Sequence, residues 1–223
     1  MKNMKFFKKL SLIIFTIATV TAVLTGCRER FDCSGYIKSM LDATYKGDFE
    51  SYALMTKSTL DAIEKDYNSF IEHETDVWLQ YCGFSAEDII PGDLKNQVTE
   101  FIKTLYKEAS YTLKEADKNG NVELTVKPVN IYNAVQKEYD QFNMEFKERN
   151  DNYEFSDYSD EDFTRAYLEP VIEIFKKHLT PVPYQEPIVV TIQVLPDDSG
   201  RYGISDDDVT TLYSSIINYT ISN

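Results

Sequence analysis

Glycine and histidine are scarce in this chain of 223 residues, and each scarcity argues against a class of site. None of the eight glycines falls in the GxGxxG or GxxxxGK spacing with which a loop wraps phosphate groups. The two histidines, His73 and His178, have no cysteine or histidine at the short spacings typical of zinc ligands. Serine, histidine and aspartate are present without the tight turn that presents a catalytic serine. We therefore expect no cofactor, no metal site and no catalytic residues.

Positive charge is also scarce. Lysine and arginine number 23 against 37 aspartates and glutamates, and beyond Lys9 the densest basic pair is Lys176-Lys177. Because nucleic-acid affinity depends on clusters of lysine and arginine that face the phosphates, we expect no nucleic-acid partner. The simplest interpretation of the acidity is a solvated surface that keeps the protein soluble, and attraction of cations is the alternative.

One long apolar run occurs, from Leu10 to Leu24, and it is shorter than the roughly 20 residues that a transmembrane helix needs. Four lysines precede it, and small residues and then charged ones follow it. A basic start, an apolar middle and small residues before the break are typical of a secretory signal peptide.

The end of this run, Leu24-Thr25-Gly26-Cys27, resembles the lipobox of bacterial lipoproteins. The resemblance implies that residues 1–26 are a cleaved signal peptide, that Cys27 carries a diacylglycerol, and that residues 27–33 are a lipidated tether. Two acyl chains hold a protein stably at a membrane, since each buried methylene contributes about 0.8 kcal/mol. Cleavage would remove four lysines and no acid, which leaves 19 basic and 37 acidic residues and a formal charge of −18. An ordinary signal peptide with an unlipidated Cys27 is the alternative.

Cys33 and Cys82 are the two other thiols. Outside the cytoplasm they could form one disulfide, and two buried thiols are an equally good interpretation, because spacing alone does not place their Cα atoms within bridging range.

Residues 34–223 are predicted to form one α+β domain, and two subdomains that divide near residues 150–160 are the alternative. Apolar residues at three- and four-residue steps predict helices that start near residues 34, 49, 58, 94, 131, 160 and 207, with Gly47 and Gly83 as stops. Ser34, Ser58, Ser159 and either Asp206 or Asp207 are the predicted N-caps.

Two stretches alternate as strands do. YTLKEADKNGNVELTVKPV predicts a hairpin with a two-residue turn at Asn119-Gly120, and IVVTIQVLP predicts a buried strand that RYGIS follows as a short partner. The predicted fold class is therefore α+β, with a small antiparallel sheet of two hairpins packed against several helices.

The order of YIKSMLDATYKGDFESY, the first hairpin and VTIQVLPDDSGRYGIS resembles poorly characterised lipoproteins of low-GC Gram-positive bacteria. Their domains are similar to the cystatin-like and nuclear-transport-factor-two-like α+β folds. The resemblance implies an extracytoplasmic domain on the outer face of the cell membrane, and it implies no activity. Additional helices at residues 58–109 and 131–178 depart from the compact forms of those folds.

Two acidic clusters and one aromatic loop remain. One cluster consists of Asp157, Asp160, Glu161 and Asp162, and the other consists of Asp206, Asp207 and Asp208. Each cluster precedes a helical pattern, so we interpret both as helix starts, with calcium binding as the alternative. Tyr153, Phe155 and Tyr158 lie in the loop before Ser159. They are either a cover over the core, which we favour, or an exposed binding edge.

These observations predict a membrane-anchored extracytoplasmic lipoprotein, held through the diacylglycerol on Cys27, whose domain binds a protein partner or small ligand without catalysis. The alternative is an enzyme of isomerase or hydrolase type, with a carboxylate beside a buried tyrosine in a pocket of a similar α+β fold. An acid with a raised pKa in such a pocket would favour the enzyme.

Overall fold

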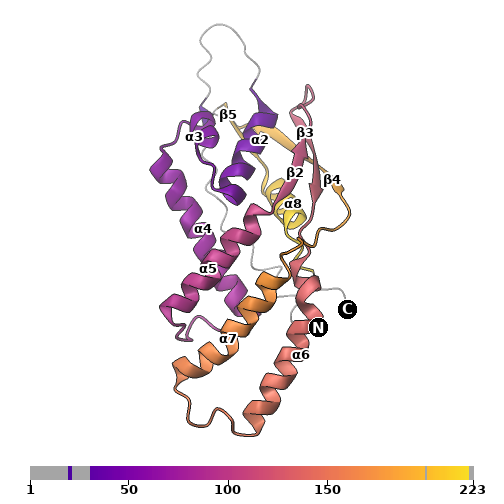
Figure 1. The fold of residues 1–223 in the computed structure, drawn as a ribbon. Helices are drawn as coiled ribbons and strands as arrows, with labels where there is room; N and C mark the ends of the chain where they lie inside the picture. The colour runs from indigo at the N-terminus through magenta and orange to yellow at the C-terminus, as the bar shows by residue number, and fades with distance from the viewer. Residues whose placement is uncertain (1–19, 22–30, 199, 221–223) are drawn as a thin grey trace.

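The computed structural model describes residues 20–21, 31–198 and 200–220, and it confirms the α+β class (Figure 1). The helices are α2 (Cys33–Leu41), α3 (Glu50–Thr56), α4 (Leu60–Tyr81), α5 (Gly92–Lys107), α6 (Ile131–Asp151), α7 (Asp160–Lys177) and α8 (Asp206–Ile216), with a π-helical turn, η1 (Asp42–Lys46), directly after α2. The strands are β1 (Val20–Thr21), β2 (Ser110–Leu113), β3 (Asn121–Lys127), β4 (Ile188–Pro196) and β5 (Arg201–Ile204). The order of helices and hairpins is the predicted one.

Both predicted hairpins form, and they join into one antiparallel sheet of order β1-β5-β4-β3-β2. The junction is the β3–β4 pair, in which Leu124 lies opposite Val190. β1 pairs with Tyr202 and Arg201 of β5 and lies inside the predicted signal peptide, so the four strands of residues 110–204 are those that the mature chain would retain.

The core lies between one face of this sheet and the helices. Val122, Leu124 and Val126 of β3 and Ile192 and Val194 of β4 point inward and are buried. The prediction that IVVTIQVLP is a buried strand is wrong for most of β4, because only alternate residues turn inward while Val189 and Leu195 are exposed. α2 contacts β3, and α8 contacts β3 and β4, so these helices hold the sheet against the core.

Three of the predicted N-caps are shifted. Asp32 caps α2 in place of Ser34, Thr59 caps α4 in place of Ser58, and Ser205 caps α8 in place of Asp206 or Asp207. In each case the side chain that accepts the N–H three residues later belongs to a residue one or two positions from the predicted cap. Ser159 caps α7 as predicted, and its hydroxyl accepts from the N–H of Asp162. α7 continues without a break through Pro170.

The turn between β2 and β3 is longer than predicted. The N–H of Asp117 donates to Asn121 O, and the N–H of Gly120 donates to Asp117 O, which closes a three-residue turn with Gly120 at φ +81°. Asn119 does not adopt a positive φ, so the predicted two-residue turn is wrong. The carboxylate of Asp117 explains the difference, because it accepts the N–H groups of both Asn119 and Asn121.

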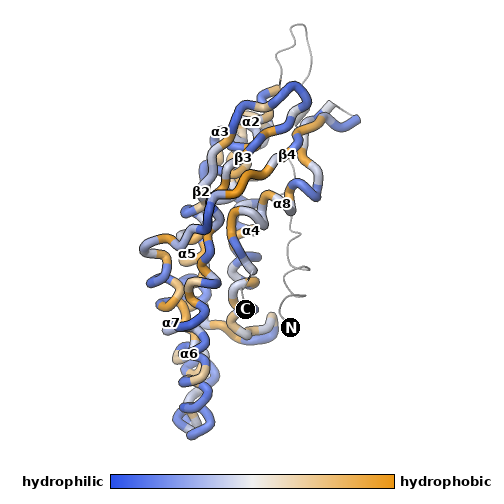
Figure 2. Tube along the Cα trace, turned by 90° about the vertical axis from the view of Figure 1, so that its right-hand side faces the viewer, coloured by the Kyte–Doolittle hydropathy of each residue, from blue (hydrophilic) through white to orange (hydrophobic). Residues whose placement is uncertain are grey.

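α6 and α7 form a helical hairpin that projects away from the sheet. Figure 1 shows its loop at the opposite end of the molecule from the start of α2, and Figure 2 shows the far end of both helices as hydrophilic. With 21 residues, α6 is about 30 Å long. Its first half carries the buried side chains Ile131, Tyr132, Val135 and Tyr139, whereas its far half carries only Phe146.

Candidate functional site

Glu74 lies on the apolar face of α4, between Ile71 and Trp78, where the helix packs into the core. Its carboxylate accepts hydrogen bonds from the hydroxyls of Tyr106 on α5 and Tyr219 near the C-terminus, and these two hydroxyls are 2.9 Å apart. We did not predict this site. The signal was present in the sequence, because an acid at three- and four-residue steps from Phe70, Ile71 and Trp78 interrupts an apolar stripe.

Burial sets the electrostatics of this cluster. It raises the pKa of Glu74, while hydrogen bonds from Tyr106 and Tyr219 and the nearby His73 oppose the rise. Burial raises the pKa of Tyr106 and of Tyr219 as well, and the charge of Glu74 adds to both shifts. Both tyrosines therefore keep their protons and act as donors to the carboxylate.

Neither of two hollows on the described surface is lined by Glu74 or its tyrosines. One, of about 450 Å³, lies between α5 and the end of α7, and its lining includes Asn96, Gln97 and Lys176. The other, of about 360 Å³, lies along the exposed face of α4 between Asp61 and Glu72. The acid and the tyrosines that the enzyme alternative requires are thus brought together, but away from both hollows.

Asp42, in the π-helical turn, is a second partly hidden acid. Tyr111 on β2 donates to it at 2.6 Å, and Lys38 and Lys46 form ion pairs with it. Burial raises the pKa of Asp42, but the hydrogen bonds from Lys38, Tyr111 and Lys46 outweigh that effect, so the net pKa lies below its ordinary value. With all its partners in place, Asp42 ties the end of α2 to the edge of the sheet.

The aromatic loop before Ser159 divides between the two interpretations that we considered. Phe155 is buried and stacks on Phe146 with ring centroids 4.7 Å apart, so it is a cover. Tyr153 is 81% exposed and Tyr158 is 47% exposed, so these two rings are not part of the cover.

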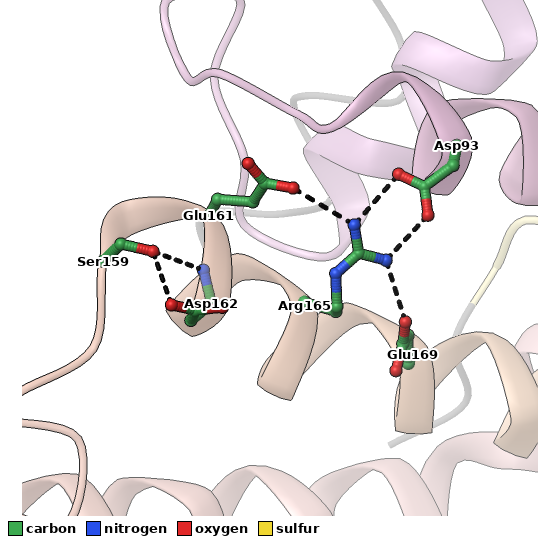
Figure 3. A network of polar contacts seen from close by, with 6 residues as sticks. All are labelled: Asp93, Ser159, Glu161, Asp162, Arg165 and Glu169. Carbon is green, nitrogen blue, oxygen red and sulfur yellow. Dashed lines mark hydrogen bonds and ion pairs between the residues drawn. The ribbon is translucent and has the colours of Figure 1, made fainter.

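Both acidic clusters lie at helix starts. Asp160, Glu161 and Asp162 occupy the first turn of α7, and Asp206, Asp207 and Asp208 occupy the first turn of α8. Figure 3 shows how the first of these turns is fixed: Arg165 of α7 bonds both carboxylate oxygens of Asp93 on α5, at 2.7 and 3.0 Å, and also contacts Glu161 and Glu169. Within residues 20–21, 31–198 and 200–220, no group of three or more acidic, histidine or cysteine side chains is arranged to hold a metal ion.

The histidines and thiols have structural surroundings. His178 is the C-cap of α7, and its Nε2 lies 3.0 Å from Glu138. His73 is half-buried beside the Glu74 cluster. Cys33 and Cys82 are both buried and are not joined in a disulfide. Burial raises the pKa of the Cys82 thiol, which keeps it protonated.

Cys27 lies outside the described residues, and the described chain resumes at Phe31. Phe31 stacks on Tyr202 of β5 with ring centroids 4.1 Å apart, and the carboxylate of Asp32 caps α2. None of the helices that the structure describes combines the length and the apolar character needed to cross a bilayer.

Comparison with known proteins gives one informative likeness. The crystal structure of a "putative lipoprotein (ycdA)" from Bacillus subtilis is similar to this chain, with a TM-score of 0.56 and 21% sequence identity over 84% of this chain and 57% of that one. The present chain therefore spans little more than half of that structure. No protein-family model and no curated protein matches the sequence. At this identity the likeness shows a shared α+β fold, and the neighbour's description is consistent with our prediction of a lipoprotein.

Proposed function

We propose that this protein is a lipoprotein of the outer face of the cell membrane, anchored by a diacylglycerol on Cys27, and that its acidic domain is a non-catalytic binding or scaffolding module. The observation that carries the proposal is the lipobox-like Leu24-Thr25-Gly26-Cys27, which ends five residues before the N-cap of α2. The fold likeness to the ycdA structure supports it. We also propose that the domain has a cystatin-like or nuclear-transport-factor-two-like α+β fold.

The short tether determines how the domain would lie. Asp32 is five positions after Cys27, and an extended chain covers at most about 3.5 Å per residue, so a lipid on Cys27 would hold the start of α2 within about 18 Å of the bilayer surface. The α6–α7 hairpin, at the opposite end of the molecule, would then point away from the membrane (Figure 1).

Fractionation of cells tests the anchor. A Cys27→Ala variant, expressed with its own leader, is expected to leave the membrane fraction and the detergent phase, and mass spectrometry is expected to find the diacylglycerol on the N-terminal cysteine of the unaltered protein. Cys33→Ala is the matched control, because it removes a nearby buried thiol and leaves the lipobox intact. An unmodified Cys27, or membrane attachment that survives its replacement, would contradict the proposal.

An enzyme is the second candidate, and the observation that favours it is the carboxylate of Glu74 beside Tyr106 and Tyr219. A catalytic site must be reachable by substrate, so nitration with tetranitromethane separates the two candidates. If the cluster is purely structural, Tyr106, which is 2% exposed, stays unmodified while Tyr153 reacts quickly. Nitration of Tyr106 and Tyr219 at the rate of Tyr153 would reveal a route to Glu74 and favour the enzyme.

A further inference from the structure

The end of the α6–α7 hairpin, residues 142–163, is a distinct structural unit, which we call the hairpin tip. Its two most buried rings, Phe146 and Phe155, do not belong to the main hydrophobic core. They stack at 4.7 Å, and Phe163 packs edge-on against both at 5.4 and 5.6 Å. Phe142 and Tyr167 connect this small cluster to the rest of the hairpin. The tip therefore has a core of its own, and its loop is held in a fixed shape.

The loop holds Tyr153 in an unusual backbone conformation. The N–H of Glu154 donates to Arg149 O, and the N–H of Tyr153 donates to Asn150 O, which together form a Schellman motif at the end of α6. The residue at the position of Tyr153 in this motif is left-handed and is usually glycine. Here Tyr153 has φ +61° and a side chain that is 81% exposed. A bulky residue in this conformation is strained, and such strain is concentrated at functional positions.

The motif is closed by charge. A hydrophobic contact often joins the two outer residues of a Schellman motif, but here Arg149 forms a two-pronged ion pair with Glu154, through Nε at 2.9 and 3.0 Å and Nη2 at 2.6 Å. The same guanidinium lies over the ring of Phe155, 4.9 Å from its centroid. The tip thus already contains one arginine bound jointly by a carboxylate and an aromatic ring.

Around these rings the tip is strongly acidic. Residues 142–163 contain eight acids and two basic residues, Lys147 and Arg149, and both basic side chains are occupied by acids of the tip. The exposed carboxylates of Glu148, Asp157 and Asp160 have no hydrogen-bond or ion-pair partner among the described residues. The same segment also carries exposed apolar side chains, which are Met144, Tyr153, Tyr158 and Phe163.

We infer that the hairpin tip is a docking surface for an arginine- or lysine-bearing segment of a partner protein, which places its cations over Tyr153 and Tyr158 and against the unpaired carboxylates. Charge complementarity selects this partner, because an acidic rim repels anionic lipid and nucleic acid, whereas aromatic faces and carboxylates both attract guanidinium groups. This inference rests on the proposed binding role but not on the lipid anchor. With that anchor, the tip faces away from the membrane, where a protein partner can reach it.

Binding of a nine-arginine peptide in 150 mM salt tests the inference. The full chain is expressed with its own leader, purified from whichever fraction contains it, and captured through a C-terminal tag. The fraction reports on the anchor, and the peptide binding reports on the tip, so the two proposals can fail separately. Loss of one exposed cation–aromatic contact is expected to weaken peptide binding about twofold to fivefold. We expect this loss in Tyr153→Gly, and a second loss of the same size when Tyr158→Ala is added.

Leu54→Ser is the matched control, because Leu54 is as exposed as Tyr153, at 81%, and lies on α3 far from the tip (Figure 1). It is expected to bind the peptide as the unaltered protein does. Tyr153→Gly alone keeps the test valid if the double variant unfolds, since Tyr158 contacts Phe155 and Tyr153 has no ring contact in the described chain. Peptide binding that all three variants share equally would assign it to the general acidity of the protein and overturn the inference. The inference would also be overturned if replacing Tyr153 and Tyr158 changed only the self-association of the protein, or its binding of a neutral oligosaccharide, and left peptide binding unchanged.

Discussion

Replacing Tyr153 with glycine should make this protein more stable. Tyr153 adopts φ +61° at the end of α6, a conformation that costs a residue with a Cβ roughly 1–2 kcal/mol and costs glycine nothing. Glycine brings a larger loss of backbone entropy on folding, about 0.5–1 kcal/mol. Because the ring is 81% exposed, little packing is lost. The net gain is about 0.5–1 kcal/mol, which for a domain of this size raises the melting temperature by roughly 1–4 °C.

Thermal unfolding followed by circular dichroism, or by calorimetry, measures this gain. Tyr153→Ala separates the two contributions, because alanine removes the ring but keeps the left-handed strain, so its melting temperature should stay close to that of the unaltered protein. Lys57→Gly is a second comparison, since Lys57 ends α3 at φ +54° and should gain a similar amount or less. If Tyr153→Gly melts at a lower temperature than Tyr153→Ala, the backbone is not strained there and the reasoning fails.

Three further outcomes follow from the interior. Burial raises the pKa of Glu74 above 4.5, so the unaltered protein should lose stability as the pH rises through that raised pKa, and Glu74→Gln should flatten this part of the pH profile of urea unfolding. Gly120→Ala should lower the free energy of unfolding by more than about 2 kcal/mol, because the added Cβ would lie 2.3 Å from Val194 O. Gly200→Ala is the control, since Gly200 has a similar φ and open space around it, and it should cost only about 1 kcal/mol. Equal losses of stability in the two variants would refute the steric argument. Asp42→Asn should lower the free energy of unfolding by about 1–2 kcal/mol at neutral pH. Because the pKa of Asp42 is depressed in the folded protein, the unaltered protein loses stability as the pH falls below about 4, and the variant should not show this loss. Unfolding measured at pH 3 and pH 7 tests both effects.

Local patterns were sufficient to predict the order of elements. The change from three- and four-residue steps to alternation located both hairpins, and Ser159 and Gly47 marked a helix start and a helix end correctly. The errors lie where a neighbouring side chain competed for the same role. Asp32 displaced Ser34 as a cap, and the carboxylate of Asp117 reshaped a turn that Asn119-Gly120 alone would have made shorter.

The candidate sites were harder to predict because they depend on contacts between distant parts of the chain. Glu74 is 145 positions away from Tyr219, and spacing along one helix does not reveal that pairing. The exposure of Tyr153 has a local cause, the Schellman motif, but a tyrosine at the position that favours glycine gives no recognisable pattern in the sequence. The sequence likewise does not show why Phe155 is buried while Tyr153 and Tyr158 are exposed, because that difference depends on which ring stacks on Phe146.

Glu74 and Tyr153 each lower the stability of the fold, and they differ in whether a contact within the chain offsets that cost. The cost of burying Glu74 is offset within the chain, because two tyrosine hydroxyls satisfy its carboxylate and the contact fastens the C-terminal residues to α4 and α5. Its presence therefore has a structural explanation. The ring of Tyr153 has no such role, since its left-handed backbone closes the Schellman motif at the end of α6 while the side chain is exposed and has no ring contact in the described chain. We propose that a tyrosine at this position, where glycine would cost less, serves a contact outside the chain, and the hairpin tip is where that contact should be sought.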